Sequence, residues 1–259
     1  MLNPWPEGIA AVEMTDCWCP LSHVPLRAEA SDRAECVNEV LAGETVTVLN
    51  EGAGNWLEVR LPDGYQGWMD RRQLRTVTSM WRGTPHRTTA LTSAWDGVPG
   101  GWLPAGACVR EHAGRWHLGE LEVVPHEGAI PHSVSSMWAW AETMRHVPYH
   151  WGGRSGWGFD CSGLVFLAAA LRGRAVPRDA SQQFLVGLEV EAGLCQLDDV
   201  AFFCNPEGRI THVGLCDGQG HILHASGEVR MDHLSAGQIL QFEDHKPTHT
   251  LAGIRRWFF

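Results

Sequence analysis

The chain has 259 residues, a hydrophobic content of 44% and a formal charge of −10 at pH 7. These totals suit a globular protein of one large domain or two to three small ones. They argue against nucleic acid as a partner, because such a surface needs a basic patch and no Lys- or Arg-rich run occurs. No segment approaches the roughly 18 apolar residues of a membrane span, so we expect no membrane partner. The sequence leaves the oligomeric state open, and a monomer is the default expectation.

The first residues, "MLNPWPEGIAAVEM", have no basic start and no sustained apolar region. A signal peptide needs both features, so the sequence predicts none. The expected location is cytoplasmic. A leader already removed from a longer precursor would change that expectation to periplasmic or extracellular.

The eight cysteines form no C-x-x-C pair, so the usual zinc spacings are missing. Most of them are expected to be reduced and partly buried. The fourteen histidines contain no H-E-x-x-H, and prolines interrupt the two pairs that are four residues apart, His146/His150 and His245/His249. We expect these four to be surface residues, with no metal site and no cofactor.

Residues 1–78 read as short strands separated by turns. "ETVTVL" (44–49) and "NWLEVRL" (55–61) are rich in β-branched and apolar residues, and "NEGAG" and "PDGYQG" supply turn chemistry. This pattern predicts a small antiparallel β-barrel or sandwich.

The next segment repeats this pattern. "EGAGNW" at 51–56 returns as "EHAGRW" at 111–116, and an Ala-Gly pair precedes each copy, at 42–43 and 105–106. A turn followed by a strand with a tryptophan, found twice, predicts a duplicated β-module. We therefore expect a second small β-domain over 79–128.

The third domain is predicted over 133–259, after the linker "HEGAIPHS" (126–133). Helical spacing of Met137, Trp140 and Met144 predicts a helix over 133–146, and a second helix starts at Cys161 and stops at Gly173. Strands follow from residue 199 onward, in "VAFFC", "ITHVGLC", "HILHAS" and "LAGIRRWFF". Helices followed by an antiparallel sheet indicate an α+β domain.

Cys161 is the candidate nucleophile. Asp160 is a good N-cap residue, which places the thiol in the first helical turn, where free N–H groups and the helix dipole favour thiolate. The same N–H groups could hold an oxyanion. An ionised Asp160 beside the sulfur should raise the thiol pKa unless its charge is engaged elsewhere.

A cysteine nucleophile needs a base, and "ITHVGLCDGQGHILHAS" (210–226) offers one. The segment reads as a hairpin that turns around "DGQG". With a loop of 216–220, His212 and His224 would lie directly opposite each other on one face; a four-residue loop would turn His224 away. We expect the loop with an odd number of residues, 216–220, with His212 as the base and His224 as the residue that orients its ring.

Together these residues resemble the NlpC/P60 family of cell-wall cysteine peptidases, which has a papain-like fold. The matching blocks are "PYHWGG" (148–153), "FDCSGLV" (159–165), "THVGL" (211–215) and "HAS" (224–226). The resemblance implies Cys161 as nucleophile, His212 as general base, His224 as third residue and Tyr149 as a hydroxyl donor. "LDDVAFF" (197–203) carries Asp198 where glycine is usual, and we expect only a change of turn there.

The two β-modules resemble bacterial SH3 domains. Two of them ahead of an NlpC/P60 domain are similar to γ-D-glutamyl-L-diamino acid endopeptidases, which act on murein-derived peptides. The resemblance implies that Glu35 and Tyr65 recognise the free amine of an N-terminal L-alanine; Glu39 is the alternative to Glu35. It also implies substrate contacts by Asp160, Ser162 and Ser181, with the substrate ammonium offsetting the charge of Asp160.

Two other functions stay open at this point. A papain-like thiol acyltransferase or amidase would keep Cys161 and His212 but need no acidic-aromatic pocket from the first β-domain. A wall-binding protein without catalysis would have lost the reactivity of Cys161. The diamino acid, diaminopimelate or lysine, and the length of stem that is cut are both left undetermined.

Overall fold

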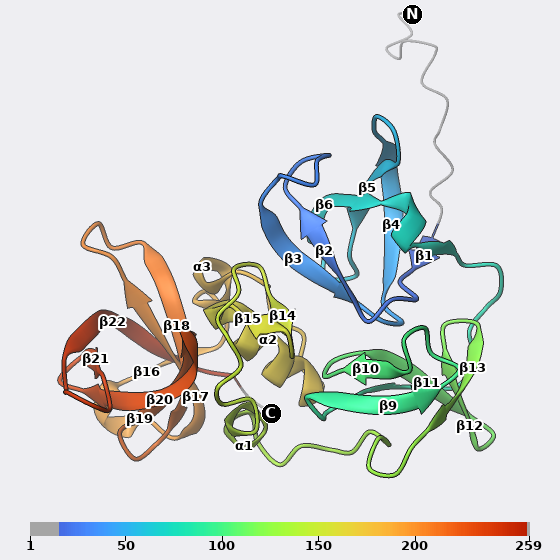
Figure 1. Cartoon of the computed structure of the whole chain (residues 1–259). Helices are drawn as coiled ribbons and strands as arrows, with labels where there is room; N and C mark the ends of the chain where they lie inside the picture. Colours follow the sequence, from blue (N-terminus) through green and yellow to red (C-terminus); the bar gives the residue numbers. More distant parts are fainter. Residues whose placement is uncertain (1–15, 258–259) are drawn as a thin grey trace, which may run out of the picture.

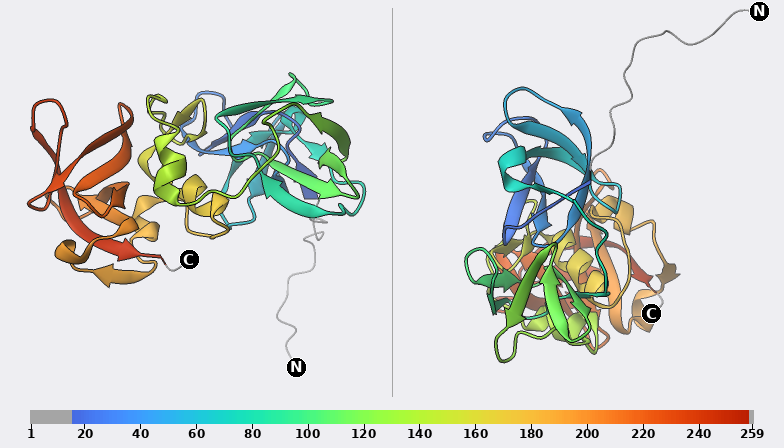
Figure 2. Two further views of the ribbon diagram at one scale, coloured as in Figure 1. Left: turned by 90° about the horizontal axis from the view of Figure 1, so that it is seen from below. Right: turned by 90° about the vertical axis from the view of Figure 1, so that its right-hand side faces the viewer.

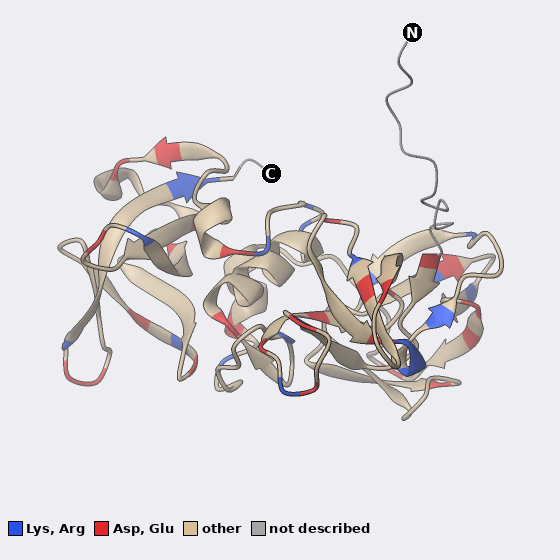
Figure 3. Ribbon diagram, turned by 90° about the horizontal axis from the view of Figure 1, so that it is seen from above, with Lys and Arg blue, Asp and Glu red and all other residues tan. Residues whose placement is uncertain are grey.

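The computed structural model describes residues 16–257. Two small β-domains lie side by side, and a group of three helices separates them from a third, C-terminal sheet (Figures 1 and 2). No helix among the described residues is long and apolar enough to cross a membrane. Acidic and basic positions are scattered over the ribbon, and no basic band follows any described element (Figure 3).

The first β-domain is a seven-stranded sheet in the order β3-β2-β6-β5-β4-β1-β7. Alternating buried and half-buried residues along β2, β4 and β5 place one face of the sheet in a core of valines and leucines. Its strands are β1 (Asp16–Trp18), β2 (His23–Arg27), β3 (Cys36–Leu41), β4 (Thr45–Glu51), β5 (Trp56–Arg60), β6 (Gln66–Asp70) and β7 (Arg75–Thr76), with the 3₁₀ turn η1 at Arg71–Gln73.

The second β-domain is a six-stranded sheet in the order β10-β9-β13-β12-β11-β8. The repeated motif forms the β4–β5 hairpin in the first domain and the β11–β12 hairpin in the second, with a left-handed glycine in each turn (Gly54, φ 67°; Gly114, φ 78°). Its strands are β8 (Thr84–Arg87), β9 (Thr92–Asp96), β10 (Trp102–Pro104), β11 (Cys108–His112), β12 (Arg115–Leu118) and β13 (Leu121–Pro125).

The two Ala-Gly pairs of the repeat lie where domains meet. A Cβ at Gly43 would fall 1.9 Å from the carbonyl oxygen of Cys108, in the second β-domain, and one at Gly106 would fall 2.7 Å from Leu167 of the third domain. Trp18, from β1, packs into the core of the second β-domain. The β-domains are therefore packed together and not joined by a loose tether.

The third domain packs three helices on a seven-stranded antiparallel sheet ordered β16-β22-β17-β18-β19-β20-β21. The sheet closes on itself because β21 also pairs with β22. The helices are α1 (Met137–Glu142), α2 (Cys161–Leu171) and α3 (Ala180–Gln183). The strands are β16 (Leu188–Val190), β17 (Leu197–Cys204), β18 (Ile210–Asp217), β19 (His221–Ser226), β20 (Glu228–Ser235), β21 (Gln238–Leu240) and β22 (Pro247–Arg256); β14 (Arg154–Ser155) and β15 (Gly158–Phe159) form a separate pair, and the 3₁₀ turn η2 spans Ala192–Leu194.

The expectation of a simple turn change at Asp198 was incomplete. Asp198 does adopt the left-handed conformation that favours glycine, with φ of 69°. Its carboxylate also accepts hydrogen bonds from the backbone N–H groups of Met137 (3.0 Å) and Trp138 (2.8 Å), the first two residues of α1. Asp198 therefore caps a helix that glycine could not cap.

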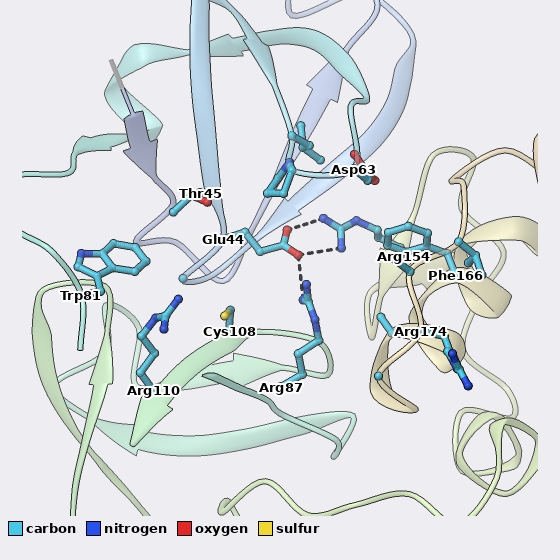
Figure 4. Close-up of a pocket in the computed structure, with 17 residues that line it drawn as sticks. Glu44, Thr45, Asp63, Trp81, Arg87, Cys108, Arg110, Arg154, Phe166 and Arg174 are labelled. Atoms are coloured by element: carbon cyan, nitrogen blue, oxygen red, sulfur yellow. Dashed lines mark hydrogen bonds and ion pairs between the residues drawn. The ribbon is translucent and has the colours of Figure 1, made fainter. Parts of the chain in front are cut away.

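Arg154 ties the first β-domain to the third domain (Figure 4). Its guanidinium, about 2% exposed, pairs with Glu44, and Glu44 also pairs at 2.9 Å with Arg87 of the second β-domain. The backbone N–H of Arg154 donates at 2.8 Å to the carboxylate of Glu39. One buried ion-pair network thus joins all three domains and fixes how they face one another.

Candidate active site

Cys161 is the first residue of α2, as predicted. The carboxylate of Asp160 caps the helix by accepting from the backbone N–H of Gly163 at 2.6 Å. The close approach of α2 to the preceding loop requires glycine at 163, since a Cβ there would lie 2.1 Å from the carbonyl oxygen of Gly153. The thiol is held at the start of a helix buried in the core of the third domain.

The charge of Asp160 is already engaged within the protein, which corrects the expectation that a substrate ammonium offsets it. Arg178 donates two hydrogen bonds to its carboxylate, at 2.9 and 2.6 Å, and Gly152 and Ser162 donate two more. Both side chains of this ion pair are at least 90% buried. Arg178 is therefore the counter-ion that the sequence analysis did not identify.

The electrostatics of Cys161 favour the neutral thiol. Burial raises the pKa of Cys161 to about 12, and the Asp160 charge adds to this effect. The backbone N–H groups of Val213 and Ser162, together with Arg178, act in the opposite direction. The helix N-terminus alone therefore does not make a resting thiolate, and the nucleophile depends on a base.

The hairpin that carries both histidines has an odd loop, as predicted, but a shorter one. β18 and β19 pair Leu215 with Leu223 and Cys216 with Ile222, which leaves a three-residue loop. In this register Gly214 lies opposite His224, so His212 and His224 are diagonal neighbours on one face rather than direct partners. The Nε2 of His212 and the Nδ1 of His224 are 2.7 Å apart.

The sulfur of Cys161 meets this hairpin at Val213, the residue after His212, whose backbone N–H faces it. His212 and His224 are almost fully buried. Burial lowers the pKa of His212 well below its usual range, and the neighbouring His224 and His249 lower it further. His212 is therefore a neutral ring near neutral pH, as a general base must be.

His249 is not the surface residue that the sequence analysis expected. It lies on β22, and its ring stacks on that of His212 with 4.2 Å between ring centroids and 24° between planes. The stacked ring covers one face of His212 and limits its rotation. The other three histidines in that expectation, His146, His150 and His245, are exposed.

Asp232, on β20, extends the contacts of the two histidines. Its carboxylate lies 3.0 Å from the Nε2 of His224 and accepts from Arg230 and from the backbone N–H of Phe242, both at 2.9 Å. Asp232 was not among the predicted site residues, although the sequence carries a signal for it. A second hairpin turn at Gly227 puts His224 and Asp232 on the same face of the sheet.

Tyr149 lies close enough to Cys161 for the two groups to interact electrostatically. Burial raises the pKa of Tyr149 to about 12, and the nearby Cys161 and Asp160 contribute to the rise. The phenol therefore keeps its proton and can act as a hydrogen-bond donor beside the sulfur.

A cleft of about 510 Å³ opens over Cys161, and the first β-domain forms its far wall. Glu35 and Tyr65 come from that domain, and Cys161 comes from the third domain. The other three predicted substrate contacts also line the cleft: Asp160, Ser162 and Ser181. His212, His224 and Tyr149 are not part of its lining.

Glu35, and not Glu39, faces the cleft. Glu35 is exposed and accepts a hydrogen bond from the indole of Trp151, at 2.5 Å. Glu39 is 3% exposed and is committed to the backbone of Arg154 at the domain junction. A further carboxylate, Asp179, also lines the cleft beside Tyr65 and was not anticipated.

The described residues hold no group of three or more His, Cys, Asp or Glu side chains placed to bind a metal ion. What they do place is a buried thiol at the start of α2 and a neutral imidazole on the neighbouring strand, where the next residue, Val213, donates its backbone N–H to the sulfur. Two further buried groups, His224 and Asp232, extend from that imidazole. This set can perform acyl transfer through a covalent thioester.

Comparison with known proteins agrees with this chemistry. The NlpC/P60 family model matches residues 146–244, and the bacterial dipeptidyl-peptidase Sh3 domain model matches residues 26–74. The γ-D-glutamyl-L-lysine dipeptidyl-peptidase of Bacillus subtilis is 30% identical over 213 residues, which is 72% of this chain and 71% of that protein. Dipeptidyl-peptidase 6 of Lysinibacillus sphaericus is 27% identical over 88% of this chain and 95% of its own length.

Among solved structures, an NlpC/P60 family protein from Bacillus cereus covers 93% of this chain and 99% of its own, with a TM-score of 0.73 and 19% identity. At that identity the likeness concerns the fold alone. The predicted combination of an NlpC/P60 domain with a bacterial SH3 domain is confirmed, and the chain belongs to the NlpC/P60 family.

Proposed function

We propose that this cysteine peptidase hydrolyses the γ-D-glutamyl–diamino acid bond of short murein stem peptides with a free N-terminal L-alanine. The observation that carries the proposal is the single cleft that brings Cys161 together with Glu35 and Tyr65 of the first β-domain. Chemistry and recognition come from different domains but meet in one cavity.

The proposed reaction begins with the thiol of Cys161. His212 takes the thiol proton, the sulfur attacks the γ-carbonyl of D-glutamate, and Tyr149 donates a hydrogen bond near the reacting oxygen. His212 then gives its proton to the departing amine of the diamino acid. Water, deprotonated by His212, releases the acyl group and restores the thiol.

The proposed recognition depends on charge. The Glu35 carboxylate is exposed in the cleft, where the indole of Trp151 donates to one of its oxygens, so it can also accept from the alanine ammonium. An N-acylated or glycan-linked stem has no ammonium there and would leave the desolvated carboxylate unpaired. Asp160 and Ser162 would act mainly by shaping the cleft, because Arg178 already bonds both.

The names of the relatives support this substrate class. Two proteins with sequence similarity are γ-D-glutamyl-L-lysine dipeptidyl-peptidases, from Bacillus subtilis and Bacillus cereus. Lysine and diaminopimelate differ by one carboxyl group on the side chain, so both belong in the test.

We further propose a papain-like domain over 133–259 and SH3-like domains over 1–78 and 79–128. Their packing supports this division, because each β-domain has its own sheet. A monomer that degrades murein peptides in the cytoplasm fits the proposed preference for short, free stems; a periplasmic or extracellular location is the alternative.

Mass spectrometry of the products tests the proposal. The substrates are L-Ala-γ-D-Glu-L-Lys and L-Ala-γ-D-Glu-diaminopimelate, each with and without a following D-alanine. We expect L-Ala-γ-D-Glu and the free diamino acid portion, and no product from Cys161→Ala. Cleavage at the alanyl bond, or undiminished products from the variant, would overturn the proposal.

A further inference from the structure

Asp232 closes a line of buried polar contacts that starts at His212. The carboxylate Oδ2 is 3.0 Å from the Nε2 of His224, and the Nδ1 of His224 is 2.7 Å from the Nε2 of His212. His224 is 1% exposed and Asp232 is 2% exposed, so water does not compete for these contacts.

We propose that Asp232 is a positioning residue that fixes the tautomer of both histidines and so leaves the Nδ1 of His212 as the atom that receives the thiol proton. This inference rests on the proposed function and adds a residue to it. It assigns the protonation state of each ring nitrogen in the line.

The assignment follows from counting donors. An ionised carboxylate can only accept, so the Nε2 of His224 must carry a proton. In a neutral ring the Nδ1 of His224 then has a lone pair, and it accepts from a proton on the Nε2 of His212. The remaining nitrogen of His212, Nδ1, is therefore unprotonated and able to act as the base.

Asp232 is held as a carboxylate with a fixed orientation. Its Oδ1 accepts from the guanidinium of Arg230 and from the backbone N–H of Phe242, each at 2.9 Å. These contacts and His224 hold the pKa of the Asp232 carboxyl below its usual range, against the effect of burial. Two donors fix which oxygen faces them and which faces His224.

This geometry makes Asp232→Asn an unusually informative variant. The carbonyl oxygen of Asn must stay with the two donors, which turns its NH₂ group toward the Nε2 of His224. His224 would then have to accept at Nε2 and carry its proton on Nδ1. Two N–H groups would face each other unless His212 also reverses, and reversal protonates the Nδ1 that should take the thiol proton.

Asp232→Ala removes the carboxylate without enforcing the wrong tautomer. We expect Asp232→Asn to lower kcat by about 10³-fold or more, as loss of the correct tautomer does in a serine-protease triad. We expect Asp232→Ala to lower kcat less. A merely structural role predicts the reverse order, because Asn fills the site and Ala leaves a cavity.

The direct readout is the protonation of the ring nitrogens in the full chain labelled with ¹⁵N-histidine. Multiple-bond ¹H–¹⁵N spectra should show both His212 and His224 protonated on Nε2 in the unmodified protein and on Nδ1 in Asp232→Asn. This measurement needs no substrate, so it tests the inference even if the proposed peptide is not cleaved.

Asp217→Asn is the matched control, because Asp217 also contacts a histidine, the Nδ1 of His221 at 2.6 Å, at the far end of the same hairpin. It should change kcat by less than about twofold, because Asp217 contacts neither the cleft nor the line from His212 to Asp232, and Asn keeps the oxygen that accepts from the hairpin turn. A wild-type His224 protonated on Nδ1, or an Asp232→Asn enzyme more active than Asp232→Ala, would overturn the inference. If Asp232→Asn does not fold, the wild-type spectrum decides alone.

Discussion

The two walls of the cleft differ in how their polar groups are satisfied. On the third-domain wall, Asp160, Ser162 and Arg178 are buried and bonded to one another. On the wall from the first β-domain, Glu35 is exposed and Tyr65 is half-buried. Under the proposed function, this difference means that reactivity depends on a pre-organised network, whereas recognition depends on open groups whose position the domain junction must secure.

Removal of the nucleophile should have the largest effect. Cys161→Ala should lower kcat/KM by at least about 10⁴-fold, because no other group in the cleft can form the thioester. Binding of L-Ala-γ-D-Glu, measured by calorimetry, should change little, since the proposed recognition groups lie on the other wall. A Cys161→Ala variant that keeps more than a hundredth of the wild-type kcat/KM would contradict the assignment of catalysis to the third-domain wall.

Disruption of the domain junction comes next. Glu44→Gln leaves Arg154 and Arg87 without their carboxylate and should lower the free energy of unfolding by about 3–5 kcal/mol. The control is Glu122→Gln, which breaks the exposed pair with Arg115 and should cost under about 1 kcal/mol. Equal changes for the two variants in urea titrations would show that the junction does not secure the wall.

A change on the open wall should be smaller and specific. Glu35→Gln should lower kcat/KM for the free-amine peptide by about 10- to 100-fold, the value of a hydrogen bond to a charged group. It should leave cleavage of the N-acetylated peptide unchanged. Glu29→Gln, at another exposed carboxylate near the same loop, serves as the control. A loss shared by both peptides would place Glu35 outside amine recognition.

The smallest effect concerns pH. Because burial, His224 and His249 all lower the pKa of His212 in the folded protein, the neutral base is present above that lowered pKa and is lost only as pH falls through it. In a plot of kcat/KM against pH, the apparent pKa of the acid limb should therefore lie below the usual histidine value of about 6.5. His249→Gln removes one of these causes and should raise the apparent pKa of the acid limb, whereas His245→Gln should leave it unchanged. A wild-type apparent pKa at or above about 6.5 would contradict the prediction that burial and the neighbouring histidines lower the pKa of His212.

The sequence predicted those parts of the site that local patterns determine. An N-cap followed by an apolar helix located Cys161, and strand parity placed His212 and His224 on one face, although the loop was two residues shorter than expected. The first β-domain and the NlpC/P60 domain were likewise predicted from turn chemistry and short motifs and are confirmed.

Partners chosen by tertiary packing could not be predicted. Nothing local to Asp160 indicates Arg178, which arrives from a loop 18 residues later. Glu35 and Glu39 have similar surroundings in the sequence, and only the approach of Arg154 from the third domain commits Glu39 to the junction. His249 reaches His212 because β22 returns across the sheet beside β17, a pairing that no short motif specifies.

The central claim is that one cavity couples the thiol of the third domain to an amine-binding wall on its neighbour. Rates of cleavage of L-Ala-γ-D-Glu-diaminopimelate and of its N-acetylated form test this most directly. The account predicts that the wild-type enzyme prefers the free amine by at least about 100-fold, because a bound peptide without the ammonium would cover the Glu35 carboxylate and leave it unpaired. Equal rates for the two peptides would contradict it.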